Sequence, residues 1–190
     1  MSEKESRVLG PESTGYKAPR WAWWVATGFG SGLLKPAPGT WGSLAAVVVW
    51  DLGFHLAWRF APGLFAKGWL WLGVLPCMAM TWLAIRASDR VVQETAEKDP
   101  SFIVADEWVG QWIALIPLWC FVSIKQPPGW FEPFRLVVPL TAFRLFDIWK
   151  PGMIRDIQAL KGGLGVVIDD VIAGFYAALV TYLWMAYGAR

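Results

Sequence analysis

The chain has 190 residues, of which 56% are hydrophobic and 17% charged, and its mean hydropathy is +0.41. A soluble domain carries about 25% charged residues, and the Trp count of 15 is high for a side chain that favours the membrane–water boundary. The net charge of +2 excludes a strongly basic surface for nucleic acid. The composition therefore predicts a single integral membrane domain with no nucleic-acid partner.

Residues 1–20 are polar and mixed in charge, without the short apolar stretch and small-residue cleavage site of a secretory signal. We interpret them as a flexible tail that precedes one membrane-embedded domain at residues 21–190. The first apolar stretch, residues 21–34, is rich in glycine and too short to cross a bilayer. We expect it to form an interfacial or re-entrant segment.

Five longer apolar stretches approach the roughly 20 residues that a helix needs to cross a bilayer. They cover residues 41–60, 64–85, 108–124, 134–149 and 165–187, the fourth being short. The sequence therefore predicts an all-α bundle with about four to five membrane-embedded helices. With five spans and a cytoplasmic N-terminus, twelve of the 17 Lys and Arg residues lie on the cytoplasmic side, which satisfies the positive-inside rule.

The loop before the first of these stretches reads TGFGSGLLKPAPGT, residues 27–40. Glycines let backbone amides approach an anion, and a lysine adds positive charge. The spacing is not that of a Walker A motif. The loop is either a Gly/Pro turn into the helix or a phosphate-binding loop, whose candidate ligands are then Gly28, Gly30, Gly32, Lys35 and Thr40.

Carboxylates flank the apolar stretches at the remaining cytoplasmic loops: Asp99, Asp106, Glu107, Asp147, Asp169 and Asp170. A carboxylate at membrane depth costs about 2.5–3.5 kcal/mol on insertion scales and is usually functional. One acidic pair in a first helical turn is equally explained by the helix dipole. Several pairs on one predicted face repel each other unless cations lie between them, and hard oxygen ligands suit Mg²⁺, Mn²⁺ or Ca²⁺.

Basic residues accompany the acids near the end of the fourth stretch. Arg144, Asp147 and Lys150 recur at three-residue spacing, so they share one face of a helix. Arg144 either pairs with Asp147 or binds a phosphate while Asp147 holds a metal. His55 is the only histidine, which excludes a phosphohistidine mechanism that needs two. Neither Cys77 nor Cys120 has an arginine six residues later, so both are interpreted as small buried apolar side chains.

Four segments, in this order, resemble the phosphatidylglycerophosphatase A family: TGFGSGLLKPAPGTWGSL, DPSFIVADEWVG, FRLFDIWKPGMIR and KGGLGVVIDDVIAG. The resemblance implies an all-α, Mg²⁺-dependent lipid phosphatase of the inner membrane, with its active site on the cytoplasmic side. Its substrate would be phosphatidylglycerol phosphate, and its product phosphatidylglycerol. The functional positions that the resemblance implies are Asp99, Asp106, Glu107, Asp147, Asp169 and Asp170, with Arg144 and Lys150 close by.

We expect direct phosphoryl transfer to water. One or two Mg²⁺ ions would acidify a bound water, held by Asp106, Glu107, Asp169 and Asp170. Lys35, Arg144 or Lys150 would neutralise charge on the phosphoryl oxygens, and Asp99 or Asp147 is the candidate base. The alternative is an ion or small-anion transporter, because buried carboxylates also mark ion pathways. A pathway would require polar residues at the midplane, whereas residues 171–183 are largely apolar.

Overall fold

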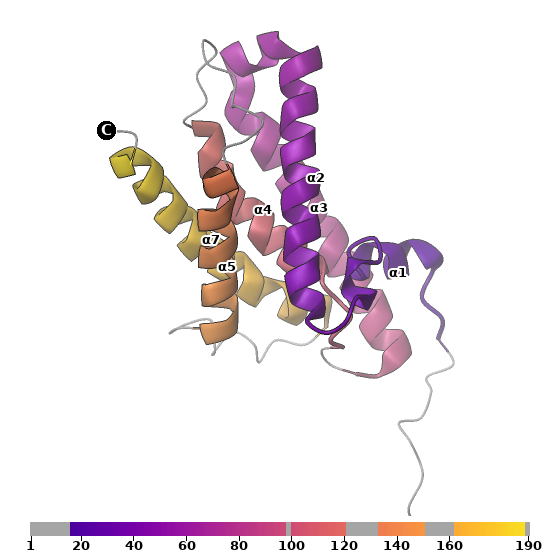
Figure 1. Cartoon of the computed structure of the whole chain (residues 1–190). Helices are drawn as coiled ribbons and strands as arrows, with labels where there is room; N and C mark the ends of the chain where they lie inside the picture. Colours follow the sequence, from indigo (N-terminus) through magenta and orange to yellow (C-terminus); the bar gives the residue numbers. More distant parts are fainter. Residues whose placement is uncertain (1–15, 98–99, 121–132, 151–161, 189–190) are drawn as a thin grey trace, which may run out of the picture.

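The computed structural model describes residues 16–97, 100–120, 133–150 and 162–188. Within these residues the chain is all-α, as the sequence predicts, with six α-helices and one 3-10 turn (Figure 1). The elements are α1 (Arg20–Ala26), η1 (Ser31–Leu33), α2 (Pro38–Phe60), α3 (Pro62–Thr95), α4 (Ala105–Cys120), α5 (Pro133–Trp149) and α7 (Gly163–Gly188).

Helix α4 lies at the centre of the bundle, in contact with α2, α3, α5 and α7. Successive long helices alternate in direction, and α1 packs against α3 to one side of the bundle (Figure 1). The first turns of α2, α4 and α7 and the last turn of α5 therefore meet at one end of the bundle, the lower end in Figure 1. Asp106 and Glu107 lie in the first turn of α4 and Asp147 in the last turn of α5, while Asp169 and Asp170 lie in the second turn of α7.

Two helical stretches of the described chain are long and apolar enough to cross a membrane, Trp71–Thr95 and Gly162–Tyr187. They correspond to the second and fifth apolar stretches of the sequence. Helices α5 and the described part of α4 have 17 and 16 residues, less than the roughly 20 that a full crossing takes. Two of the five stretches thus form candidate membrane-spanning helices by length and composition.

Large apolar side chains cover the outside of the bundle, while small ones fill much of the inside. Val48, Leu52 and Leu56 recur every fourth residue on the outer face of α2 and are 65%, 53% and 47% exposed. Phe175 and Leu179 do the same on α7, at 62% and 57%. An apolar surface this extensive is exceptional for a monomeric soluble protein. It fits a chain whose outer faces contact lipid.

The two backbones of α4 and α7 touch at a pair of glycines. A Cβ at Gly174 would lie 2.6 Å from the carbonyl oxygen of Gly110, and a Cβ at Gly110 would lie 2.5 Å from the carbonyl oxygen of Asp170. Small residues allow such close helix approach in membranes. Gly110 follows Asp106 by four residues, and Gly174 follows Asp170 by four. The glycine contact therefore sets these two carboxylates side by side.

The expected end of the second apolar helix at residue 85 is wrong, because α3 continues to Thr95. The hydropathy falls after Ile85, but small buried residues continue at helical spacing. Ala84, Ala87 and Val91 are all fully buried. This polar extension packs against α1. Glu94 near its end accepts hydrogen bonds from the Trp23 indole (2.9 Å) and the Ala18 amide (2.8 Å).

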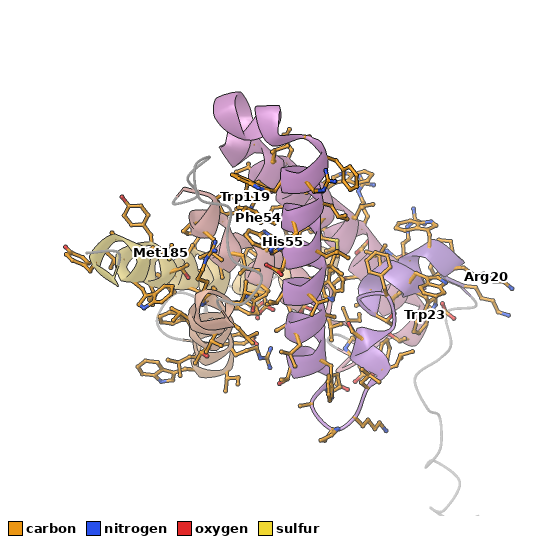
Figure 2. The ribbon with its side chains drawn as sticks, turned by 45° about the horizontal axis from the view of Figure 1, so that its top comes forward. Arg20, Trp23, Phe54, His55, Trp119 and Met185 are labelled. Carbon is orange, nitrogen blue, oxygen red and sulfur yellow. The ribbon has the colours of Figure 1, made fainter. Side chains whose placement is uncertain are left out.

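The segment that we expected to be interfacial, residues 21–34, contains α1 and η1 and no helix of membrane length. Trp21 and Trp24 are 46% and 61% exposed on its outer side. Figure 2 shows Arg20 and Trp23 on α1, at the side of the bundle, well apart from the aromatic cluster of Phe54 and Trp119 at its far end. Those two rings meet at a centroid distance of 4.7 Å.

Candidate active site

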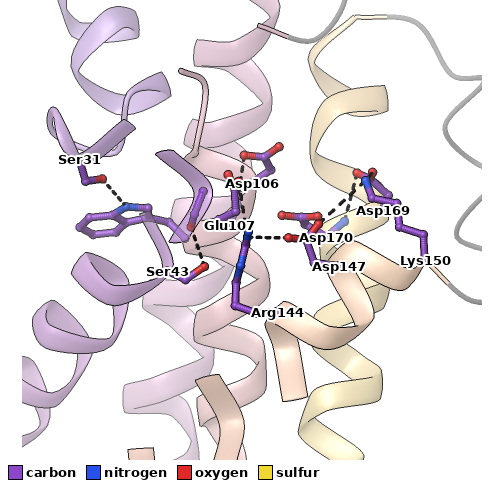
Figure 3. A network of polar contacts seen from close by, with 11 residues as sticks. Ser31, Ser43, Asp106, Glu107, Arg144, Asp147, Lys150, Asp169 and Asp170 are labelled. Atoms are coloured by element: carbon purple, nitrogen blue, oxygen red, sulfur yellow. Dashed lines mark hydrogen bonds and ion pairs between the residues drawn. The ribbon is translucent and has the colours of Figure 1, made fainter. Parts of the chain in front are cut away.

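A cavity of about 510 Å³ opens at the end of the bundle where the charged turns meet. Its charged lining comes from α4, from the end of α5 and from α7: Asp106, Glu107, Arg144, Asp147, Lys150, Asp169 and Asp170. These residues are separated by up to 64 positions in the sequence, and the helix ends bring them into one network (Figure 3). The sequence had placed all seven on one membrane face.

Three carboxylates of the cavity converge on one point. Ligand oxygens of Asp106, Glu107 and Asp170 all lie within 4.8 Å of one another. Asp106 is 9% exposed and Asp170 only 3%. One buried oxygen on each of Glu107 and Asp170, Oε2 and Oδ2, has no hydrogen-bond partner among the described residues. Two buried acceptor oxygens of the cluster therefore have no donor within the described part of the chain.

The crowding changes the acidity of Glu107, which lies in the first turn of α4, ahead of the apolar stretch. Burial raises the pKa of its carboxyl to about 7, and the charges of Asp170 and Asp147 act in the same direction, against a hydrogen bond with Asp106 and the charge of Arg144. A nearby cation would favour the ionised form.

The two basic residues of the cavity sit beside the carboxylates (Figure 3). Arg144 Nη1 lies 2.6 Å from Asp147 Oδ2 and 3.7 Å from Glu107 Oε1. Lys150 Nζ lies 2.5 Å from Asp169 Oδ2 and 4.0 Å from Asp147 Oδ1. Burial opposes the charge of Lys150, but the hydrogen bond to Asp169 and the surrounding carboxylates raise its pKa above the ordinary value. The amine stays protonated.

The donor set fits a divalent metal with oxygen ligands. Carboxylates alone form the triad of Asp106, Glu107 and Asp170, and no histidine or cysteine belongs to it. This is the ligand chemistry of Mg²⁺, Mn²⁺ and Ca²⁺. Asp169, which we also expected as a ligand, is instead bound through Oδ2 to Lys150 and accepts the Asp170 amide through Oδ1. Its predicted metal role remains a prediction.

The glycine-rich loop, residues 27–40, reaches the acidic cavity through Ala37, Pro38 and Gly39, whereas its earlier glycines lie elsewhere. Gly28 and Gly32 approach Val104 so closely that a Cβ on either would lie within 3 Å of its side chain, while nothing lies within 4 Å of a Cβ built on Gly30. Lys35 is exposed, and neither it nor these glycines lines the acidic cavity. Their phosphate-binding role stays untested, and Asp99 lies outside the described residues.

Gly39 is a site residue that the sequence prediction missed. It lies in the first turn of α2 and lines the cavity. A Cβ there would overlap Glu107 Oε1 and lie 3.1 Å from Arg144 Nη1. A glycine in a Gly/Pro turn is too common for its position alone to reveal such a contact.

We expect Gly39→Ala to lower kcat/KM for phosphate release by about ten- to hundredfold, because the methyl group displaces Glu107 and Arg144 and such misplacement is costly. Gly53→Ala is the matched control, since it lies in the same helix and its Cβ would meet nothing within 4 Å. Equal activity of the two variants in a phosphate-release assay would refute this positioning role.

Gln111 is the second residue that the sequence did not single out. It lies one helical turn after Glu107, is 0% exposed, and neither amide atom has a hydrogen-bond partner among the described residues. Its neighbours on the same helical face, Ala114 and Leu118, are apolar and buried. An unpaired buried amide costs about 1–3 kcal/mol.

Gln111→Leu is therefore expected to raise the unfolding temperature of the detergent-solubilised protein, because leucine fills a similar volume without an unpaired amide. Gln93→Leu provides the comparison, as that side chain is exposed and donates to Asp89 at 3.0 Å; it is expected to bring no gain. A lower melting temperature for Gln111→Leu would mean that the amide has a polar partner after all.

The fold is a helical bundle with two candidate membrane-spanning helices. Its cavity contains a carboxylate cluster that could bind a metal ion, beside Arg144 and Lys150. The sequence matches the family model described as phosphatidylglycerophosphatase A over residues 24–185. The chain therefore belongs to the phosphatidylglycerophosphatase A family of phosphatases, which confirms the resemblance of the four sequence segments.

Named relatives agree with this family. The chain is 32% identical over 163 residues to a phosphatidylglycerophosphatase A of Escherichia coli, covering 83% of this chain and 80% of that protein. It is 34% identical over 169 residues to one of Haemophilus influenzae, covering 85% and 88%. A Bacteroides thetaiotaomicron protein named "Putative phosphatidylinositol-3-phosphatase" is 34% identical over 156 residues, covering 82% and 88%. No solved structure matches the chain.

Proposed function

We propose that this protein hydrolyses the terminal phosphomonoester of phosphatidylglycerol phosphate, giving phosphatidylglycerol and inorganic phosphate with Mg²⁺ as cofactor. The observation that carries the proposal is the convergence of Asp106, Glu107 and Asp170 within 4.8 Å, in the same cavity as Arg144 and Lys150. Metal ions and fixed positive charges are recurring means of stabilising the charge on the phosphoryl oxygens. The family supports the choice of lipid substrate.

The three carboxylates Asp106, Glu107 and Asp170 would hold the Mg²⁺. When bound, the ion supplies Lewis-acid stabilisation of phosphoryl charge and lowers the pKa of coordinated water. The glycine contact between α4 and α7 fixes the spacing of these ligands before any substrate arrives. A rigid ligand frame of this kind reduces the reorganisation needed during the reaction.

Arg144 and Lys150 would bind and orient the phosphoryl group. In the free protein each is held beside a carboxylate, Asp147 for Arg144 and Asp169 for Lys150. The planar guanidinium can make two parallel hydrogen bonds to a phosphate, and the ammonium acts as a point charge. Asp147 contacts both cations, and Arg144 also lies 3.7 Å from Glu107 of the carboxylate triad. Asp147 is also our candidate for the base.

We propose further that the bundle is embedded in the inner membrane with this cavity at the cytoplasmic face. Two membrane-length helices, the exposed apolar outer faces and the uneven distribution of Lys and Arg support this orientation. The reacting phosphate then stays at the water boundary while the diacylglycerol part of the substrate remains in lipid. A phosphatase for a soluble substrate would need no such embedding.

The test is phosphate release by the purified protein from three lipids in mixed micelles: phosphatidylglycerol phosphate, phosphatidylinositol 3-phosphate and phosphatidic acid. We expect the highest kcat/KM with phosphatidylglycerol phosphate, and loss of activity in EDTA that Mg²⁺ restores. Preference for the inositol lipid, which the name of the Bacteroides relative raises, would reassign the substrate. Activity that survives EDTA would contradict the metal requirement.

A further inference from the structure

A second cavity, of about 410 Å³, adjoins the charged one at the end of the bundle. Its wall consists of one face of α5 and the first turn of α2: Thr40, Leu140, Thr141, Arg144, Leu145, Ile148 and Trp149. On α5 these residues fall into two rows at four-residue spacing, which together form one continuous face of the helix. We call this cavity the α2–α5 groove.

The groove and the charged cavity share one residue, Arg144. Its guanidinium lies beside Asp147 and Glu107 in the charged cavity. Away from Arg144, the groove offers only apolar side chains and two threonine hydroxyls. The chemistry of the surface therefore changes at Arg144, from charged to apolar.

The apolar side of the groove opens outward. Leu145, Ile148 and Trp149 are 56%, 74% and 66% exposed, on the last two turns of α5. Tryptophan is enriched where a membrane meets water, and Trp149 lies next to Lys150 in the charged cavity. A lipid whose hydrocarbon chain enters the groove would thus have its headgroup next to the phosphate site.

We propose that the α2–α5 groove binds an acyl chain of the phospholipid substrate while the phosphate lies beside Arg144 in the charged cavity. This inference rests on the proposed function. An amphiphile with a phosphomonoester at one end and a hydrocarbon chain at the other matches the order of the two cavities, and Arg144 marks the junction. The Thr40 and Thr141 hydroxyls offer hydrogen bonds to ester oxygens near that junction. Thr40, which we had expected at the phosphate, lines this groove, and its phosphate-binding role stays a prediction.

The test compares one substrate at two chain lengths, phosphatidylglycerol phosphate with dioleoyl chains and with dihexanoyl chains. Leu145→Trp, and separately Ile148→Trp, should fill the groove. We expect the ratio of kcat/KM for the long chain to that for the short chain to fall at least about tenfold, mainly through KM, because apolar burial grows with each buried methylene. Activity on the short chain reports whether each variant is folded.

The matched control is Leu179→Trp on α7, because Leu179 is 57% exposed, almost as Leu145 is, and lies outside the groove. It should leave the ratio at the wild-type value. An unchanged ratio in both groove variants, or an equal fall in the control, would overturn the proposal and leave general contact with bulk lipid as the use of this surface. Wild-type protein that releases phosphate from neither substrate would overturn the proposed function together with it.

Discussion

Asp170→Asn is expected to reduce Mg²⁺-dependent phosphate release by at least about a hundredfold. Asp170 is 3% exposed and belongs to the carboxylate triad, and its Oδ2 has no partner among the described residues. The amide keeps the shape of the side chain but removes a negative ligand. A cation contributes several kcal/mol of transition-state stabilisation, and about 1.4 kcal/mol corresponds to a tenfold change in rate.

The same variant should fold at least as well as the wild type. Without added Mg²⁺, we expect its melting temperature to be equal or higher, since one of several mutually repelling buried carboxylates is removed. Asp51→Asn is the control, because Asp51 lies in the middle of α2, within 3.5 Å of His55. Full activity in Asp170→Asn, or the same loss in Asp51→Asn, would show that the carboxylate triad does not hold the catalytic metal.

Arg144→Lys is expected to lower kcat/KM by about ten- to hundredfold while leaving the protein folded. The lysine keeps the positive charge near Asp147 and Glu107, so no buried carboxylate loses its nearest cation. It loses the planar fork that can hold two phosphate oxygens at once. The loss should appear with the short-chain and the long-chain substrate alike, because the phosphate is common to both.

Arg86→Lys is the comparison for Arg144→Lys. Arg86 lies on α3, with its guanidinium 5.5 Å from the centre of the Trp82 ring, and it does not line the charged cavity. Activity should stay close to that of the wild type. If Arg144→Lys retained full activity, the phosphate would have to be bound by other groups, and Lys150 would be the first to examine.

Much of the fold follows from hydropathy. Residues 134–149 and 165–187 were expected as helices and correspond to α5 and α7 within two residues at each end. The C-terminal end of α3 did not follow, because its last ten residues are mostly polar, although Ala87 and Val91 among them are fully buried. Nor did the meeting of α4 and α7, which depends on two glycines placed one turn after two aspartates. The sequence around a glycine in an apolar stretch does not show which residue of another helix that glycine will contact.

The sequence predicted the charged residues of the candidate site, but not the glycine contacts that position them. The distribution of Lys and Arg placed the loops of the site's carboxylates on one membrane face, and the repulsion expected among them predicted a bound cation. The expected ligands were Asp106, Glu107, Asp169 and Asp170. The phosphate-binding role of the glycine-rich loop stays a prediction, and Gly28 and Gly32 lie close to Val104. Close backbone approach to an anion and close packing require the same absence of a side chain. Sequence alone therefore does not distinguish a glycine that binds an anion from one that allows close packing.

The central claim, that carboxylates of α4 and α7 hold a divalent cation, is tested most directly by metal binding to the purified, metal-stripped protein. Mn²⁺ is a suitable probe, because it takes the same oxygen ligands as Mg²⁺ and its free form can be followed by electron paramagnetic resonance. We expect saturable binding of one or two ions per chain, competed by Mg²⁺, and an affinity at least about tenfold lower in Asp170→Asn. Equal affinity in the wild type and in Asp170→Asn, or no saturable binding in the wild type, would contradict the claim.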